Sequence, residues 1–342
     1  MPAMKNSATI SDVARAAKTG KTSVSRYLNG EQHRLSDALR LRIEQAIRGL
    51  NYRPNQMARG LKRGRTRLIG VIIADITNPY SIEILGGIES TCREHGYTLL
   101  VCNANNETEL EAHYLKLLYS YQVEGIIINA VGIREFSFGQ HPHPTIPTVL
   151  IDRKITGQAL DMVGLDNHQA TQLCVQHLLH QGFQALLFLS EPVACVNTRR
   201  ERQHVFHTLL QKHPDIAAES RQIALTAPSG ELDALINTFQ HRYKKSPCAI
   251  VSANGAIALH IARALKRLSL VPGKDIGLLS FDELPWADLV SPGITTLQQP
   301  TTLIGQAALE RLILRIQGSA DAPADKLFPG RLNFRGSTQI SN

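Results

Sequence analysis

From residue 68 onward, short apolar runs alternate with stretches of helical periodicity, and this alternation limits the fold more than any other feature of the chain. In residues 80–94, for example, Ile84, Leu85, Ile88 and Cys92 share one helical face. Strand–helix alternation is typical of parallel sheets covered by helices. About nine such units exceed one doubly wound sheet, so two α/β subdomains are predicted. The predicted strands are residues 68–74, 97–102, 125–130, 148–151, 161–165, 185–190, 223–226, 249–252 and 276–281, with a last one over about 326–334.

The charge is concentrated before this region. Residues 1–67 contain 15 Lys and Arg against 4 Asp and Glu, a net charge of +11. The other 275 residues contain 22 against 25, a net charge of −3. A small, strongly basic module on a nearly neutral body indicates a polyanionic partner, most often nucleic acid.

Several function classes lack their sequence signatures. No window reaches the ~18 consecutive apolar residues of a membrane span, and residues 1–12 contain no apolar segment typical of a secretory signal. The five cysteines are far apart and form no CxxC pair, so neither a zinc site nor a disulfide framework is expected. Gly20-Lys21-Thr22 lacks the upstream glycine of a P-loop, because Arg15 stands there. We therefore expect a cytoplasmic protein with reduced thiols and no cofactor, metal or enzymatic activity.

The basic module has the pattern of three short helices. Thr9 to Asp12 has the T-x-x-D form of a helix N-cap, and residues 21–28 form a second helix that ends at Asn29-Gly30. A third helix begins at Ser36. Helix, tight turn and helix within about 20 residues is helix-turn-helix geometry. The second helix would present donors suited to base edges and phosphates, namely Lys21, Thr22, Ser23, Ser25 and Arg26. The alternative is a three-helix packing domain with a solvated basic face.

Three segments of this module resemble the DNA-binding headpiece of the LacI family of bacterial regulators. They read T-I-S-D-V-A-R-A-A, T-S-V-S-R-Y-L-N-G and N-Y-R-P-N-Q-M-A-R-G-L, and the match runs from Thr9 to about Lys62. The resemblance implies that Lys21, Thr22 and Arg26 read bases and that Ser25 and Asn29 contact phosphates. It also implies a hinge helix over residues 54–61 that enters the minor groove with Asn55, Ala58 and the apolar wedge Leu61.

The turn between the first two helices departs from the family pattern. The family usually has Gly-Val-Ser, with the serine as N-cap, whereas this chain has Lys18-Thr19-Gly20. Glycine at an N-cap lowers helix stability by only about a few tenths of a kcal/mol, so we expect the fold to be retained. Lys18 would then have to adopt a left-handed conformation.

The resemblance continues along the body in the segments A-D-I-T-N-P-Y-S, V-E-G-I-I-I-N-A, L-I-D-R-K, G-L-D-N, L-L-S-F-D and P-G-I-T-T-L-Q-Q-P. It implies a periplasmic-binding-protein-like core of two Rossmann-like subdomains, joined by crossovers near Asp166, Gln298 and Lys326. The expected domains are a helix-turn-helix headpiece (1–53), a hinge helix and linker (54–66), and an effector-binding and dimerisation core (67–342). Within the core we expect an N-subdomain of about 67–166 and 299–326 and a C-subdomain of about 167–298 and 327–342.

An effector is expected in the cleft at the carboxyl ends of the strands, where open α/β sheets bind ligands. Asp152 is one polar residue that ends a predicted strand there. The predicted effector contacts are Tyr80, Ser81, Asn129, Arg153, Arg202, Asn254, Asp282, Trp286 and Gln299.

One departure at the cleft indicates the class of effector. Sugar-binding relatives commonly have Asn-Asp where this chain has Asn254-Gly255. Loss of a carboxylate lessens repulsion of an anion, while Arg153 and Arg202 favour a carboxylate. The segments I-A-D-I-T-N-P-Y and F-D-E-L-P-W also resemble the family branch that senses keto-aldonates such as 2-keto-3-deoxygluconate or 2-ketogluconate. The hypothesis is therefore a sugar-acid effector.

These observations together predict a homodimeric transcriptional repressor of a carbohydrate catabolic operon. Two headpieces would bind a palindromic double-stranded operator, and the effector would control the order of the hinge helices. No C-terminal leucine heptad is present, so a dimer is expected. A neutral sugar effector and corepression remain alternatives, and a transporter's solute receptor and a small-molecule enzyme are rivals from other classes.

Overall fold

The computed structural model describes residues 8–53, 65–131, 146–155, 157–193 and 196–340. The chain divides into two compact units, residues 1–66 and residues 67–342. The predicted hinge residues Asn55, Ala58 and Leu61 lie outside the described residues.

The first unit is the predicted helix-turn-helix. Its helices are α1 (Ile10–Ala16), α2 (Lys21–Leu28) and α3 (Asp37–Gly49), with a 3-10 turn η1 (Gln32–Arg34). Thr9 and Asp12 form a capping box, in which the Thr9 backbone N–H donates to Asp12 Oδ2 at 2.9 Å. Apolar side chains at Val13, Val24 and Ile43 are fully buried where the three helices meet.

The turn between α1 and α2 has the conformation expected from its sequence. Lys18 has φ of +50°, in the left-handed region that costs a residue with a Cβ about 1–2 kcal/mol. Gly20 is the N-cap of α2 and supplies no side-chain hydrogen bond to the helix. The departure from Gly-Val-Ser therefore leaves the helix-turn-helix intact, at the cost of a strained lysine and a weaker cap.

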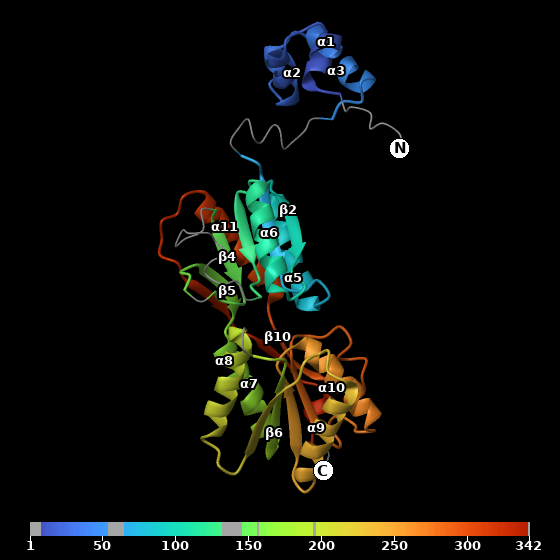
Figure 1. The fold of residues 1–342 in the computed structure, drawn as a ribbon, viewed down its shortest axis with the longest axis vertical. Coiled ribbons are helices and arrows are strands. Elements are labelled where there is room, and N and C mark those ends of the chain that lie inside the picture. The colour runs from blue at the N-terminus through green and yellow to red at the C-terminus, as the bar shows by residue number, and fades with distance from the viewer. Residues whose placement is uncertain (1–7, 54–64, 132–145, 156, 194–195, 341–342) are drawn as a thin grey trace. The chain divides into compact units, whose positions relative to one another are not determined.

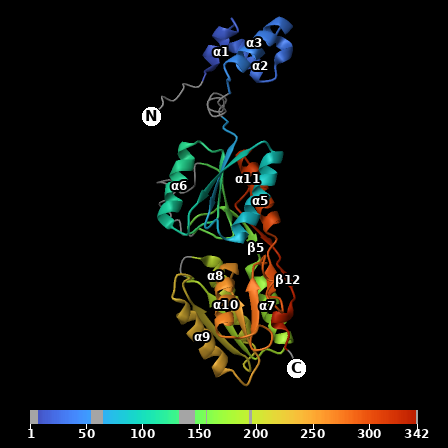
Figure 2. The ribbon, with the colours of Figure 1, turned by 90° about the vertical axis from the view of Figure 1, so that its right-hand side faces the viewer.

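The second unit contains two six-stranded sheets, and we call the parts built on them the N-subdomain and the C-subdomain. The first sheet has the order β11-β5-β4-β3-β1-β2, and all its pairs are parallel. Its strands are β1 (Leu68–Ile73), β2 (Thr98–Asn103), β3 (Gly125–Ile128), β4 (Thr148–Ile151), β5 (Asp161–Leu165) and β11 (Asp325–Phe328). Helices α5 (Pro79–Glu94) and α11 (Thr301–Ile316) cover one face, and α6 (Thr108–Ser120) covers the other (Figure 2).

The second sheet has the order β12-β10-β9-β8-β6-β7, with only β12 antiparallel. Its strands are β6 (Ala185–Ser190), β7 (Ala217–Gln222), β8 (Cys248–Ser252), β9 (Gly277–Phe281), β10 (Thr295–Gln298) and β12 (Arg331–Asn333). Helices α7 (Asn167–His180) and α8 (Asn197–Leu210) pack on one face, and α9 (Ser229–Arg242) and α10 (Gly255–Arg267) pack on the other (Figure 1). The prediction of two Rossmann-like subdomains is therefore confirmed.

Two sequence-based assignments need correction. The strand predicted at 223–226 lies at 217–222, and its sequence A-A-E-S-R-Q was missed because β7 is a half-exposed edge strand without an apolar run. The last predicted strand, 326–334, is two strands in different sheets: β11 pairs with β5, and β12 pairs with β10. The third crossover therefore lies at residues 329–330, just beyond the predicted Lys326.

Among the described helices, none combines the length and apolarity that a membrane crossing requires.

Candidate functional site

A narrow cavity of about 70 Å³ lies between the two subdomains. It is built where strands end: Asn129 follows β3, Asp152 follows β4, Glu191 follows β6, Asn254 follows β8 and Asp282 follows β9. Because all these strands are parallel within their sheets, their carboxyl ends bring polar loop residues together. The lining side chains also include Tyr80, Ser81, Arg153, Thr198, Arg199, Arg202 and Gln299.

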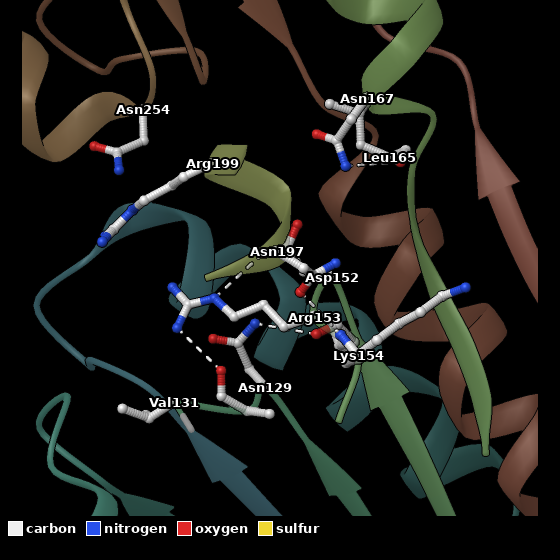
Figure 3. Close-up of polar contacts among 12 residues, drawn as sticks. Asn129, Val131, Asp152, Arg153, Lys154, Leu165, Asn167, Asn197, Arg199 and Asn254 are labelled. Atoms are coloured by element: carbon white, nitrogen blue, oxygen red, sulfur yellow. Dashed lines mark hydrogen bonds and ion pairs between the residues drawn. The ribbon is translucent and has the colours of Figure 1, made fainter. Parts of the chain in front are cut away.

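The N-subdomain wall is held by backbone contacts. Asn129 Nδ2 donates to the Ile151 carbonyl oxygen at 3.2 Å. Arg153 Nη1 donates to the Ala130 carbonyl oxygen at 3.0 Å, and Arg153 Nε lies 3.7 Å from Asp152 Oδ2 (Figure 3). These contacts fix the guanidinium of Arg153 over the ends of β3 and β4.

The C-subdomain wall is built around Arg202, whose exposed fraction is 4%. Its Nε donates to Asn167 Oδ1 at 2.7 Å, and its Nη1 donates to the Ala253 carbonyl oxygen at 2.6 Å. The guanidinium carbon lies 4.3 Å from the centre of the Phe281 ring, a cation–π distance. Contacts with α7, with the residue after β8 and with β9 therefore fix one face of this buried cation.

Asp282 joins the C-subdomain wall to the crossover that follows β10. Its Oδ1 accepts from Gln299 Nε2 at 2.6 Å, and its Oδ2 accepts from the Gly255 backbone N–H at 2.8 Å. Its φ of +72° lies in the left-handed region, and its side chain lines the cavity. Burial raises the pKa of Asp282, while the charge of Arg202 opposes that rise. Burial, together with the nearby charge of Asp152, raises the pKa of Tyr80 well above its usual value.

Within the part of the chain that the structure describes, four buried polar atoms of the cavity have no hydrogen-bond partner: Tyr80 Oη, Asp152 Oδ1, Arg153 Nε and Gln299 Oε1. Buried polar atoms in proteins are almost always hydrogen-bonded, because leaving one unpaired costs about 1–3 kcal/mol. These atoms come from both subdomains and from the crossover. The cavity is therefore prepared for a polar ligand that supplies both donors and acceptors.

The first unit presents the predicted DNA-reading residues on α2. Lys21 and Thr22 are exposed, whereas Ser23, Ser25 and Arg26 are half-buried. Asn29 caps the end of the helix, and its Nδ2 donates to Ser25 Oγ at 3.3 Å. Val24 faces the core, so the polar side chains of α2 are left on its outer side.

Comparisons with known proteins identify both units. The model described as "Bacterial regulatory proteins, lacI family" matches residues 9–55, and the model described as "Periplasmic binding proteins and sugar binding domain of LacI family" matches residues 66–336. The chain belongs to the LacI family.

Relatives of this LacI-family chain are named as regulators. The HTH-type transcriptional regulator PtxS of Pseudomonas aeruginosa is 43% identical over 96% of this chain and 95% of its own length. The HTH-type transcriptional regulator KdgR of Bacillus subtilis is 36% identical over 92% of this chain and 93% of its own length. A crystal structure of the lac repressor dimer, bound to operator and an anti-inducer, covers 98% of this chain and 99% of its own, with a TM-score of 0.81 and 25% identity. The prediction of a regulator that is not an enzyme is confirmed.

In this LacI-family chain, eight of the nine predicted effector contacts line the cavity. Trp286 is the exception and lines an apolar groove beside α10, with Leu259 and Val290. The reason is local: Leu284 and Ala287 are buried under α10, so the chain turns from the cavity directly after Asp282.

Sequence reasoning missed three charged residues of the cavity, namely Asp75, Glu191 and Arg199. Glu191 directly follows β6, and the strand-end rule used for Asp282 would have found it. Arg199 lies one helical turn before Arg202 on α8, and only the run R-R-E-R signalled it. With them included, three arginines face the carboxylates of Asp75, Asp152, Glu191 and Asp282, so the lining has no excess of arginine.

Proposed function

We propose that this LacI-family repressor has a sugar acid as its effector and that the acid binds in the cavity between the subdomains. The supporting observation is the set of unpartnered atoms. Asp152 Oδ1 and Gln299 Oε1 accept only, so the ligand has to donate hydroxyl groups to them. Arg153 Nε donates only, and a carboxylate is the acceptor that a guanidinium binds most strongly. A polyhydroxy acid supplies both kinds of group.

Within that class, a keto-aldonate is the effector that the motifs favour. The branch resemblance rests on I-A-D-I-T-N-P-Y, which leads into Tyr80, and on F-D-E-L-P-W, which contains Asp282. Both segments contribute side chains to the cavity. Asn254 N-caps α10 by accepting from the Ile257 backbone N–H at 3.1 Å, and Gly255 places no carboxylate beside it.

Calorimetry with a panel of ligands tests the effector class. We expect 2-ketogluconate or 2-keto-3-deoxygluconate to bind more tightly than D-gluconate, and D-gluconate more tightly than D-fructose or D-ribose. A preference for a neutral pentose or hexose would contradict the proposal and would favour the neutral-sugar alternative.

The regulatory step would follow from the position of the cavity. Its two walls belong to different subdomains, and the Lys154 backbone N–H of the N-subdomain already donates to Asn197 Oδ1 of the C-subdomain at 3.1 Å. A ligand that contacts both walls stabilises one arrangement of the subdomains over others. In our proposal that arrangement lowers affinity for a palindromic operator. Gel shifts with and without 2-ketogluconate test the direction, and tighter DNA binding with the ligand would indicate corepression.

A homodimer is the assembly that we propose. In the described residues, apolar side chains are exposed on both subdomains: Leu289 is 80% exposed, Ile82 is 50% exposed on α5, and Val101 is 45% exposed on the edge strand β2. The apolar groove lined by Trp286 and Val290 adds to this surface. Apolar surface on an edge strand and beside a groove is typical of protein–protein contacts. Analytical ultracentrifugation is expected to give a dimer, and a stable tetramer would contradict this.

A further inference from the structure

The cavity contains an ion pair that belongs entirely to the C-subdomain. Arg199 Nη2 donates to Glu191 Oε1 at 2.5 Å, and the two side chains are 14% and 12% exposed. Asn254 Nδ2 donates to the other carboxylate oxygen, Glu191 Oε2. We call Glu191, Arg199 and Asn254 the Glu191 cluster. Figure 3 shows Arg199 extending from α8 toward Asn254.

The Glu191 cluster faces a cation on the opposite wall. Arg153, from the end of β4, lines the same cavity and has a buried Nε without a hydrogen-bond partner. Arg153 and Arg202 line the cavity with Arg199 and their positive charges oppose that of Arg199, while the carboxylates of Glu191 and Asp152 offset this effect. Among them, Arg199 is the one paired with a carboxylate at hydrogen-bond distance, and its partner lies on its own wall.

We propose that Glu191 is an internal counter-ion that occupies Arg199 in the ligand-free protein, and that the carboxylate of the effector takes its place between Arg199 and Arg153. This rests on the proposed sugar-acid function and names the groups that read the acid. An anion between two cations from opposite walls joins the walls and stabilises the closed arrangement, whereas in the ligand-free protein each cation has its carboxylate on its own wall, Glu191 for Arg199 and Asp152 for Arg153.

Exchange of the counter-ion is feasible from the contacts present. Arg199 Nη1 also donates to the Pro192 carbonyl oxygen at 3.2 Å, which holds the arginine near the cavity when Glu191 leaves. Glu191 keeps its contact with Asn254, and its side chain, which is 12% exposed, stays on the C-subdomain wall. Competition from Glu191 would set the affinity and would select an anion over a neutral sugar, because only an anion replaces a carboxylate without leaving Arg199 uncompensated.

The test compares two variants that each remove one charge of the pair, with 2-ketogluconate and D-fructose as probes. These two differ only in having a carboxylate or a hydroxymethyl group at C1. Glu191→Gln removes the competing charge but keeps an acceptor for Asn254, so we expect it to tighten 2-ketogluconate binding three- to tenfold. Arg199→Gln is expected to weaken that binding at least tenfold and to reduce the preference for the acid over D-fructose. Arg200→Gln is the matched control, because Arg200 is the exposed neighbour on α8 and does not line the cavity.

The variants separate this inference from a structural role for the pair. If the pair only braced α8, Glu191→Gln would weaken 2-ketogluconate binding or leave it unchanged, and either result overturns the inference. Unchanged binding in Arg199→Gln overturns it as well. Because Arg199→Gln leaves a buried carboxylate unpaired, the double variant Glu191→Gln/Arg199→Gln is measured too, with melting curves to verify folding. If the unaltered protein binds no acid probe, the proposed function itself fails.

Discussion

Gln299 Nε2 donates to Asp282 Oδ1 at 2.6 Å and so links the crossover after β10 to the end of β9. Gln299 Oε1, on the same amide, is buried without a partner. A ligand that bonds Gln299 Oε1 would therefore act on the segment that leads from the second sheet into α11 of the N-subdomain.

Asp282→Asn is expected to stabilise the core and to weaken effector binding. Because burial raises the folded-state pKa of Asp282, its stabilising contribution is present below its unfolded pKa and is lost as the pH rises through the folded pKa. An asparagine does not ionise, so stability is no longer lost as the pH rises. The Gln299 amide can rotate so that its free oxygen accepts from the new NH₂ group. Calorimetric melting between pH 4 and 8 should show a higher melting temperature near neutrality and a flatter pH profile.

The matched control for this variant is Asp288→Asn, which removes the same charge from an exposed side chain nearby. It should leave the melting profile and effector binding unchanged. A lower melting temperature for Asp282→Asn near pH 7 would contradict the assignment of Asp282 as a destabilising buried acid.

Replacement of two adjacent glycines of α5 by alanine is expected to change the stability of the protein in opposite directions. A Cβ on Gly87 would lie 2.3 Å from the Thr302 carbonyl oxygen of α11, whereas a Cβ on Gly86 meets nothing within 4 Å. Gly87→Ala should destabilise the protein by about 1–3 kcal/mol, because backbone has to move. Gly86→Ala should stabilise it by up to about 1 kcal/mol through helix propensity. Urea unfolding measures both, and equal effects would argue against close packing of α5 on α11.

Asp161 is expected to make the core sensitive to acid. It is 2% exposed and accepts from Arg315 Nε at 2.6 Å, with Arg311 Nε 2.9 Å away. Burial raises its pKa, but the hydrogen bonds from Arg315, Ala324 and Arg311 outweigh that effect and lower it. A lowered folded-state pKa gives stability that is present above the unfolded pKa and lost as the pH falls through the folded value.

Asp161→Asn should therefore cost about 3 kcal/mol at pH 7, as breaking a buried pair does, and should reduce the loss of stability below about pH 4. Asp321→Asn is the control, because its side chain is 74% exposed and lies 3.7 Å from Arg311. Its effect should stay below about 1 kcal/mol. If the pH dependence of stability below pH ~4 were the same in Asp161→Asn, Asp161 would not be the source of the acid sensitivity.

Local patterns predicted the parts of this fold that local physics determines. The capping box at Thr9, the left-handed Lys18 and the apolar strands follow from short-range sterics and from burial. The edge strand β7 was missed because an edge needs pairing to one neighbour only, and the polar run that contains Glu219 does not resemble a strand.

The cavity residues likewise divide into those that local patterns predicted and those that depend on tertiary packing. Strand ends predicted Asn129 and Asp282, because parallel topology alone brings them to one side of their sheets. The Glu191–Arg199 pair was not predicted, because it depends on how α8 packs beside the end of β6, and no sequence spacing shows that packing. Trp286 was misplaced because the burial of Leu284 and Ala287 turns the loop away.

Arg26 is expected to determine sequence selectivity on DNA. It lies on the outer, polar side of α2, and an arginine that reads a base contributes about 1–3 kcal/mol of discrimination. Arg26→Ala should therefore weaken binding to operator DNA much more than binding to unrelated DNA. Arg48→Ala removes the same charge from α3, where Arg48 is paired with Glu44, and should affect both DNAs equally and weakly. Fluorescence anisotropy at two salt concentrations separates the two effects, and an unchanged ratio of affinities in Arg26→Ala would show that Arg26 contacts only the phosphate backbone.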